Sequence, residues 1–275
     1  LRDGHGAQHA AKGDGLVSWL EHGWQVFDAE PAVTARLDTA GPEAIRASRE
    51  PGHRKSWLRH RGTWFVGVDV LPNGPDGAVA GGPPLGGAAL AEALKVTGAL
   101  PLHPAQVSVT YPGYPRQDPG ESDAAHRFRR DRDAAHLDGL LPVGPEKRRF
   151  LRETHAFILG IAVTEASEGA APLVVWEGSH RMIRDVFAQA FDGVPEAEWS
   201  GIDMTDIYKF VRRDIFATCP RREVPLAPGQ AVLVHRHAIH GVAPWAAGAS
   251  AAPDGRATVY FRPELRQFTD WLTLP

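Results

Sequence analysis

The stretch PGQAVLVHRHAIHG, Pro228 to Gly241, contains the pattern that decides the fold. Its Pro-Gly pair is a turn signal, and the apolar, β-branched run that follows predicts a short strand. Three histidines, His235, His237 and His240, stand at the exit of that strand. A histidine beside a glycine can reach a bound ion without crowding, which makes His240 the best placed of the three. We therefore expect a strand end that carries one ligand of a larger site.

The rest of the chain supplies further short strands separated by turn residues. Strands are predicted at Thr63–Leu71 and between Gln106 and Arg262, with interrupting helices near Met182–Phe191 and Met204–Arg212. Many short strands wrapped by helices are typical of a jelly-roll barrel, which holds ligands in its open mouth. We predict a mainly β fold with flanking helices and a cupin-like barrel core.

All 275 residues are expected to form one domain, with an N-terminal part at about residues 15–100 and a jelly-roll core at about residues 106–262. Residues 15–60 are predicted to be helical, and residues 88–96 form a second predicted helix. The apolar positions of the first helical part are Leu16, Trp19, Leu20, Val26 and Phe27. Between them and the second helix, residues 72–87 are rich in Gly and Pro, and we expect this loop to act as a mobile lid over the substrate mouth. The alternative is a flexible surface connection.

The segment His136-Leu137-Asp138 predicts two ligands of one metal ion. In an extended chain alternate side chains share a face, so His136 and Asp138 point the same way. With His240 as the third ligand, the set is two imidazoles and one carboxylate, the arrangement of non-haem Fe(II) oxygenases. The alternatives are a hydrogen-bonded surface turn for the pair and a solvated or aromatic-packed cluster for His235, His237 and His240.

The segment Arg256–Arg262 alternates as a strand and places Arg256, Thr258, Tyr260 and Arg262 on one face. An arginine on an inward face needs an anion, and a guanidinium binds a carboxylate through two parallel hydrogen bonds. Thr258 can add a third bond. Arg256 and Thr258 are therefore predicted to hold the far carboxylate of a dicarboxylic acid whose other end chelates the metal. The alternative is an exposed strand residue.

At this point the chain resembles the phytanoyl-CoA dioxygenase-like family of Fe(II)- and 2-oxoglutarate-dependent oxygenases. The resemblance covers about residues 106–262 and rests on an ordered set of segments. These are His136-Leu137-Asp138, the strand from Ile161 to Ala166, the turn Trp176-Glu177-Gly178-Ser179-His180, the Gly229–His240 segment and Arg256. Glu177 departs from the proline usual at its position. Gln106 resembles a glutamine that helps to hold 2-oxoglutarate in some members.

The resemblance implies a double-stranded β-helix and a 2-oxoglutarate-dependent dioxygenase that uses Fe(II) and O2. It further implies hydroxylation of a small-molecule substrate with release of succinate and CO2, the substrate itself being unknown. Two other classes stay open. A metal-dependent isomerase or hydrolase on a similar barrel would keep the metal ligands but not need Arg256 and Thr258. A non-catalytic binding or sensing protein would keep the barrel without turnover.

Composition and charge limit the classes of partner and the cellular location that we expect. The chain has 30 Lys and Arg against 33 Asp and Glu, a net charge of -3, so we expect no nucleic acid partner. No apolar run reaches the length of a membrane span and no signal peptide is visible, so we expect no membrane partner. The chain begins at Leu1, which leaves open whether a leader was removed. The single cysteine, Cys219, forbids an internal disulfide and favours a cytoplasmic location. The oligomeric state is left open.

One basic run precedes the first metal ligand. It reads Arg127-Phe128-Arg129-Arg130-Asp131-Arg132-Asp133 and has acids interleaved with its arginines. The simpler interpretation is a solvated loop. Because the run lies just before His136, the other interpretation is a surface that faces an anionic substrate.

Overall fold

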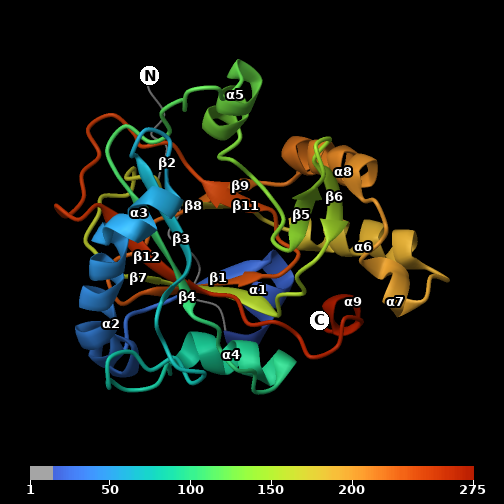
Figure 1. Cartoon of the computed structure of the whole chain (residues 1–275). Helices are drawn as coiled ribbons and strands as arrows, with labels where there is room; N and C mark the ends of the chain where they lie inside the picture. Colours follow the sequence, from blue (N-terminus) through green and yellow to red (C-terminus); the bar gives the residue numbers. More distant parts are fainter. Residues whose placement is uncertain (1–14) are drawn as a thin grey trace, which may run out of the picture.

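The computed structural model describes residues 15–275, with side chains from Trp19 onward (Figure 1). Its strands form three antiparallel sheets: a seven-stranded sheet in the order β1-β10-β7-β12-β4-β3-β2, a three-stranded sheet in the order β11-β8-β9, and the β5-β6 pair. The strands are β1 (Trp24–Phe27), β2 (Leu58–Arg59), β3 (Trp64–Leu71), β4 (Ala105–Thr110), β5 (Leu140–Val143), β6 (Arg148–Leu151), β7 (Phe157–Ala162), β8 (Leu173–Trp176), β9 (Arg221–Val224), β10 (Ala231–His235), β11 (His240–Val242) and β12 (Arg256–Phe261).

The helices lie outside the sheets. In Figure 1, α2, α3 and α4 lie beside the seven-stranded sheet, while α6, α7 and α8 form a separate group at the right. The helices are α1 (Gly15–His22), α2 (Pro31–Arg49), α3 (Pro51–Trp57), α4 (Ala88–Thr97), α5 (Asp123–Asp131), α6 (Ser179–Phe191), α7 (Glu196–Trp199), α8 (Thr205–Thr218) and α9 (Asp270–Thr273). Within residues 15–275 no helix is long and apolar enough to cross a membrane.

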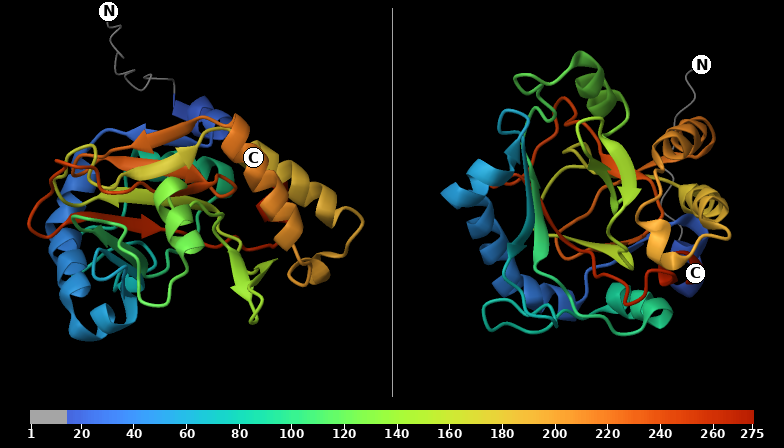
Figure 2. Two further views of the ribbon diagram at one scale, coloured as in Figure 1. Left: turned by 90° about the horizontal axis from the view of Figure 1, so that it is seen from above. Right: turned by 45° about the vertical axis from the view of Figure 1, so that its right-hand side comes forward.

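The seven-stranded sheet is buried on both faces, because alternate residues of its strands enter two different cores. On the outer face, side chains such as Phe65, Val107 and Val259 pack with apolar residues of α2 and α4. On the inner face, side chains such as Ile158 and Val232 pack with residues of β8 and β9 from the three-stranded sheet. The two sheets therefore face each other across a shared apolar layer (Figure 2).

The predicted mainly β fold with flanking helices is confirmed. The facing sheets have the layered arrangement of a jelly roll. No closed barrel forms among the described residues, because the strand pairings end at β1 and β2 on one sheet and at β11 and β9 on the other.

Most predicted elements are present, and two predictions were wrong. The strand at residues 63–71 and the helices near residues 88–96, 182–191 and 204–212 are confirmed as β3, α4, α6 and α8. Val26 and Phe27 do not continue a helix: Gly23, at φ 87°, ends α1 and starts β1, which pairs with β10. The basic run at residues 127–133 is not a loop, since most of it lies in α5. The predicted packing of the Leu16 side chain lies outside the described side chains.

The Gly- and Pro-rich loop at residues 72–87 packs on the outer layer. Val79 and Leu85 are buried in the core that the sheet shares with the helices. The buried Arg36 of α2 donates a hydrogen bond from Nε to the Gly77 carbonyl oxygen at 3.0 Å. The lid role of this loop stays a prediction. The packing of the loop against α2 is also expected if the loop is only a connection between elements.

Candidate metal centre

A backbone pairing brings His136 to His240. His240 is the first residue of β11, and it forms an isolated antiparallel bridge with His136, which lies just before β5. The His136 nitrogen donates to the His240 oxygen at 2.9 Å, and the His240 nitrogen donates to the His136 oxygen at 3.1 Å. The two imidazole ring centroids are consequently only 4.6 Å apart. The main chain therefore fixes the relative position of the two rings.

The predicted metal ligands meet at one point. One ligand atom from each of His136, Asp138 and His240 lies within 4.8 Å of the others. Asp138 Oδ1 is 3.2 Å from His136 Nε2 and 3.7 Å from His240 Nε2. Two imidazole nitrogens and one carboxylate oxygen form a donor set that suits Fe(II) and leaves other coordination positions free.

The second nitrogen of each ring is engaged with the main chain. His136 Nδ1 lies 3.1 Å from the Ala134 oxygen, and His240 Nδ1 lies 2.9 Å from the Ala238 oxygen. A carbonyl oxygen only accepts, so Nδ1 is the donor in each contact, and Nε2 is the ring nitrogen left to bind a metal. Such contacts to the outer nitrogen orient histidine ligands in metal sites. Both Nε2 atoms thus lie on the side of Asp138 Oδ1.

Arg262 orients the carboxylate. Its Nη1 donates to Asp138 Oδ2 at 3.3 Å, which occupies one oxygen and leaves Oδ1 facing the two imidazoles. Burial alone would raise the pKa of Asp138, but the charge of Arg262 and the two neighbouring histidines hold that pKa well below its usual range. Burial lowers the pKa of His240 to about 4 against the opposing effect of Asp138. Asp138 is therefore ionised and His240 neutral at neutral pH, the states that bind metals.

The sequence indicated Arg262 only indirectly. Alternation along β12 placed it on the same face as Arg256, but nothing local to residues 256–262 showed that Asp138 would be its partner. The two residues are 124 positions apart in the chain, and only the folded structure brings them together.

Arg256 and Thr258 lie on the inner face of the seven-stranded sheet. Arg256 is opposite Thr110 of β4, and Thr258 is opposite Ser108. Arg256 is 6 % exposed and Thr258 1 % exposed. Arg256 Nη2 and the Oγ1 atoms of Thr258 and Thr110 are buried and have no hydrogen-bond partner among the described residues. Buried polar groups are normally satisfied, so three unsatisfied atoms on one face indicate a place built for a polar ligand.

Thr110 was missed in the sequence, although it belongs to the strand that Gln106 opens. Gln106 is half-buried and lies opposite Tyr260, four positions from Thr110 on the same face of β4. At a rise of about 3.3 Å per residue this separates Gln106 from Thr110 by about 13 Å. Its role in holding 2-oxoglutarate stays a prediction.

The two other histidines of the Gly229–His240 segment do not join the metal ligands. His235 and His237 are buried at 2 % and 0 % exposure. Their ring centroids are 5.0 Å apart with the planes tilted by 57°, and the His237 ring packs against that of Trp271 at 4.1 Å. The prediction that His240 alone completes the ligand set agrees with this geometry.

Comparison with known proteins finds no matching family model and no matching curated protein. Several solved structures are similar to this chain at low identity. One is the non-heme alpha ketoglutarate dependent carbocyclase SnoK from nogalamycin biosynthesis, 18 % identical, with 94 % of this chain and 85 % of that chain covered and a TM-score of 0.47. AviO1 from Streptomyces viridochromogenes Tue57 is 16 % identical, with coverage of 92 % and 95 % and a TM-score of 0.48. EctD from S. alaskensis, solved with 2-oxoglutarate and 5-hydroxyectoine, is 13 % identical, with coverage of 90 % and 74 % and a TM-score of 0.41.

Proposed function

We propose that this chain is an Fe(II)- and 2-oxoglutarate-dependent oxygenase of the phytanoyl-CoA dioxygenase-like type, which hydroxylates a small molecule. The observation that carries the proposal is the pairing of two sites in one interior. His136, Asp138 and His240 could hold a metal ion. The buried guanidinium of Arg256, whose Nη2 has no hydrogen-bond partner among the described residues, faces the same space between the two sheets. A metal alone would need only the first site.

Each residue has a defined task in this proposal. His136, Asp138 and His240 hold the metal, and Arg262 keeps one oxygen of Asp138 away from it. When bound, Fe(II) and 2-oxoglutarate would allow dioxygen to act as the oxidant of the substrate. 2-Oxoglutarate would be converted to succinate and CO2. Arg256, with the hydroxyls of Thr258 and Thr110, binds the far carboxylate of 2-oxoglutarate and excludes water from it.

The first test measures binding and turnover together. Under anaerobic conditions, Fe(II) and 2-oxoglutarate should produce a visible charge-transfer absorption that neither gives alone, since both must bind to the same ion. In air, the same mixture should form succinate. His136→Ala, Asp138→Ala and His240→Ala should lose both signals, whereas His237→Gln, a buried change outside the ligand group, should keep the absorption.

The outcomes separate the alternatives. Metal binding without any response to 2-oxoglutarate would indicate a metal-dependent isomerase or hydrolase. Absorption without succinate, even with a broad pool of metabolites, would indicate a binding or sensing protein. Analysis of the oxidised product would test hydroxylation separately, because the assignment of Asp138 as a ligand predicts incorporation of oxygen and no incorporation of chloride.

A further inference from the structure

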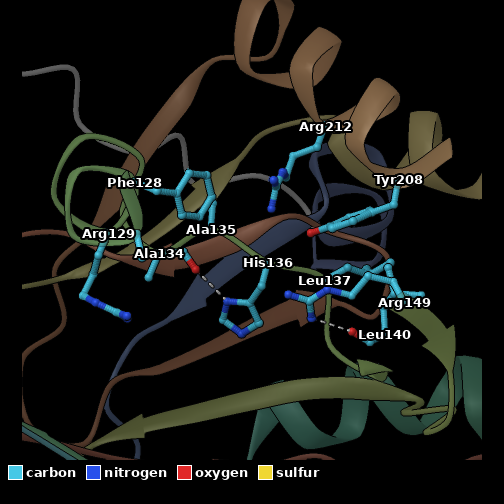
Figure 3. A pocket seen from close by; sticks show the side chains of 11 residues that line it. Phe128, Arg129, Ala134, Ala135, His136, Leu137, Leu140, Arg149, Tyr208 and Arg212 are labelled. Atoms are coloured by element: carbon cyan, nitrogen blue, oxygen red, sulfur yellow. Dashed lines mark hydrogen bonds between the residues drawn. The ribbon is translucent and has the colours of Figure 1, made fainter. Parts of the chain in front are cut away.

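A pocket lies directly beside the candidate metal ligand His136. It has a volume of about 210 Å³ and is lined by residues of α5, the segment before β5, β5 itself, β6 and α8. Figure 3 shows His136 at its lower side, with Arg212 and Tyr208 reaching in from α8. His136 is the exposed member of the ligand group, with 47 % of its side chain accessible. A molecule in this pocket would therefore touch the metal centre from the solvent side.

The lining is strongly cationic. Arg129, Arg149 and Arg212 come from three different elements, and none of the lining residues is acidic. Acidic groups close to this region are already paired. Asp133 binds Arg221 through two hydrogen bonds of 2.7 Å, and Asp203 pairs with Arg148. Glu121 compensates the charge of Arg129, but Arg149 and Arg212 have no acidic partner among residues 19–275. Since like charges repel, these two guanidinium groups cost free energy unless an anion compensates them.

Arg212 has the freest guanidinium of the three. Its Cζ lies 4.7 Å from the Phe128 ring centroid and 5.1 Å from that of Tyr208. Stacking uses the face of the guanidinium and leaves the N–H donors at its edge available. Among residues 19–275 Arg212 forms no ion pair, whereas Arg129 is held by Glu121 at 2.9 Å. The aromatic rings thus fix a planar cation that has no carboxylate partner among the described residues.

Two further donors line the same space. Tyr208 is 3 % exposed, and its hydroxyl is buried without a hydrogen-bond partner among the described residues. In Figure 3 this hydroxyl points into the pocket on the side of Arg212. Arg149 uses Nη1 for the Leu140 oxygen at 3.2 Å and has other N–H groups to offer. The apolar side chains of Phe128, Leu137 and Leu140 complete the lining.

We propose that this pocket binds the oxyanion of the substrate, a carboxylate or a phosphate, through Arg212, Arg149 and the Tyr208 hydroxyl. The substrate would then be a small anionic molecule with an apolar part, held beside His136. That this molecule is the compound oxidised rests on the proposed oxygenase function. That the pocket binds an anion does not depend on that function. The site is distinct from the Arg256 group, which lies on the inner face of the seven-stranded sheet.

The test uses three probes of similar shape: benzoate, phenyl phosphate and the neutral benzamide. Calorimetric titration of the metal-free protein without 2-oxoglutarate should show one or both anions binding at least about ten-fold more tightly than benzamide. Arg212→Met should remove most of this preference. Arg149→Met provides a second variant, and Tyr208→Phe should weaken binding less because it removes a neutral donor.

Two variants serve as controls. Arg213→Met changes the next residue of α8, which is exposed and pairs with Asp214 at 3.4 Å, so anion affinity should stay as in the wild type. Arg256→Leu should also keep it, which separates this pocket from the 2-oxoglutarate site. A higher affinity for benzoate or for phenyl phosphate would show which oxyanion the substrate carries.

The proposal is overturned if neither anion binds more tightly than benzamide. It is equally overturned if Arg212→Met and Arg149→Met bind the anions as the wild type does, or if Arg256→Leu abolishes the binding. If the protein binds the anions at Arg212 but never forms succinate, the anion pocket is supported and the oxygenase function is contradicted. The failure of one proposal can therefore be distinguished from the failure of the other.

Discussion

Gly241 lies so close to Asp133 that a Cβ atom on Gly241 would stand 2.1 Å from the Asp133 carbonyl oxygen. The same oxygen accepts a hydrogen bond from the Val242 nitrogen at 2.8 Å. The chain segment that leads into His136 is thus pressed against β11, the strand that begins with His240. Only a glycine permits this approach, so the spacing of the His136 and His240 rings depends on a residue outside the group of candidate ligands.

Gly241→Ala should therefore weaken metal binding. The added methyl group must push the segment before His136 away and disturb the bridge between His136 and His240. We expect the affinity for Co(II), a stable substitute for Fe(II), to fall by about ten-fold or more, as measured by equilibrium titration. Gly41→Ala is the control, because its Cβ would meet Val163 at an ordinary 3.5 Å. Unchanged Co(II) affinity in a folded Gly241→Ala protein would contradict the prediction.

Arg262→Met should also weaken metal binding, through a different cause. Without the hydrogen bond to Asp138 Oδ2, the carboxylate can rotate and also loses the cation that holds its pKa down. Loss of such an orienting partner typically lowers metal affinity about 10–100-fold. The same titration measures the effect, with Arg266→Met as an exposed control whose side chain reaches the Ala99 oxygen instead. An affinity equal to that of the wild type would show that Asp138 needs no orientation.

The meeting of His136, Asp138 and His240 could be predicted from the sequence because the signals of these residues are local. A spacing of two residues places His136 and Asp138 together in any extended segment, and His240 follows a strand with a clear turn before it. The same holds for Arg256 and Thr258, whose shared face follows from alternation alone.

The other features of the fold and of the site depend on contacts between distant segments, which no local sequence pattern shows. The four residues Trp24–Phe27 are too few to reveal a strand, and they become β1 only because β10 lies beside them. The contact between Arg262 and Asp138 requires the assembled sheets. The cationic pocket is formed by arginines of α5, β6 and α8, and the basic run of the sequence supplies only Arg129.

Arg256→Met should abolish the response to 2-oxoglutarate but not to the metal. A ligand that binds only the folded state stabilises it by mass action, by about 2.7 kcal/mol at a hundred times its dissociation constant. With Co(II) present, 2-oxoglutarate should raise the melting temperature of the wild type and leave that of Arg256→Met unchanged. The rise with Co(II) alone should persist in both. A full 2-oxoglutarate shift in Arg256→Met would exclude this residue as the carboxylate-binding group.

Arg236 should be a major stabilising residue outside the group of candidate metal ligands. It is 1 % exposed and donates to the carbonyl oxygens of Trp271, Leu274 and Pro275, two of them at 2.8 and 3.0 Å. Arg236→Met removes all three hydrogen bonds at the end of α9, and we expect unfolding free energy to fall by about 2–4 kcal/mol in denaturant titration. The exposed control Arg127→Met should change it by less than about 0.5 kcal/mol. A loss no greater than that of the control would show that these bonds are dispensable.

The last prediction concerns acid stability and His180. Burial lowers the pKa of His180 to about 4, and the nearby charges of Arg181, His22 and Arg184 act in the same direction. In the unfolded chain a histidine has a pKa of about 6.5. Above that pH both states are neutral at this residue and folding carries no proton-linked cost. As the pH falls below it, only the unfolded chain takes up the proton, so stability decreases until the folded pKa is reached.

At about 1.4 kcal/mol per pKa unit, this residue should cost about 2 kcal/mol of stability at pH 5 relative to pH 7.5. His180→Gln keeps a donor for the Leu20 oxygen, which His180 Nε2 contacts at 3.0 Å, and removes the titration. Unfolding free energies measured between pH 7.5 and 4.5 should therefore decline less steeply in His180→Gln than in the wild type. Some decline should remain, because burial also lowers the pKa of His235 and His237. The exposed His103→Gln should follow the wild type, and parallel curves for the wild type and His180→Gln would contradict the prediction.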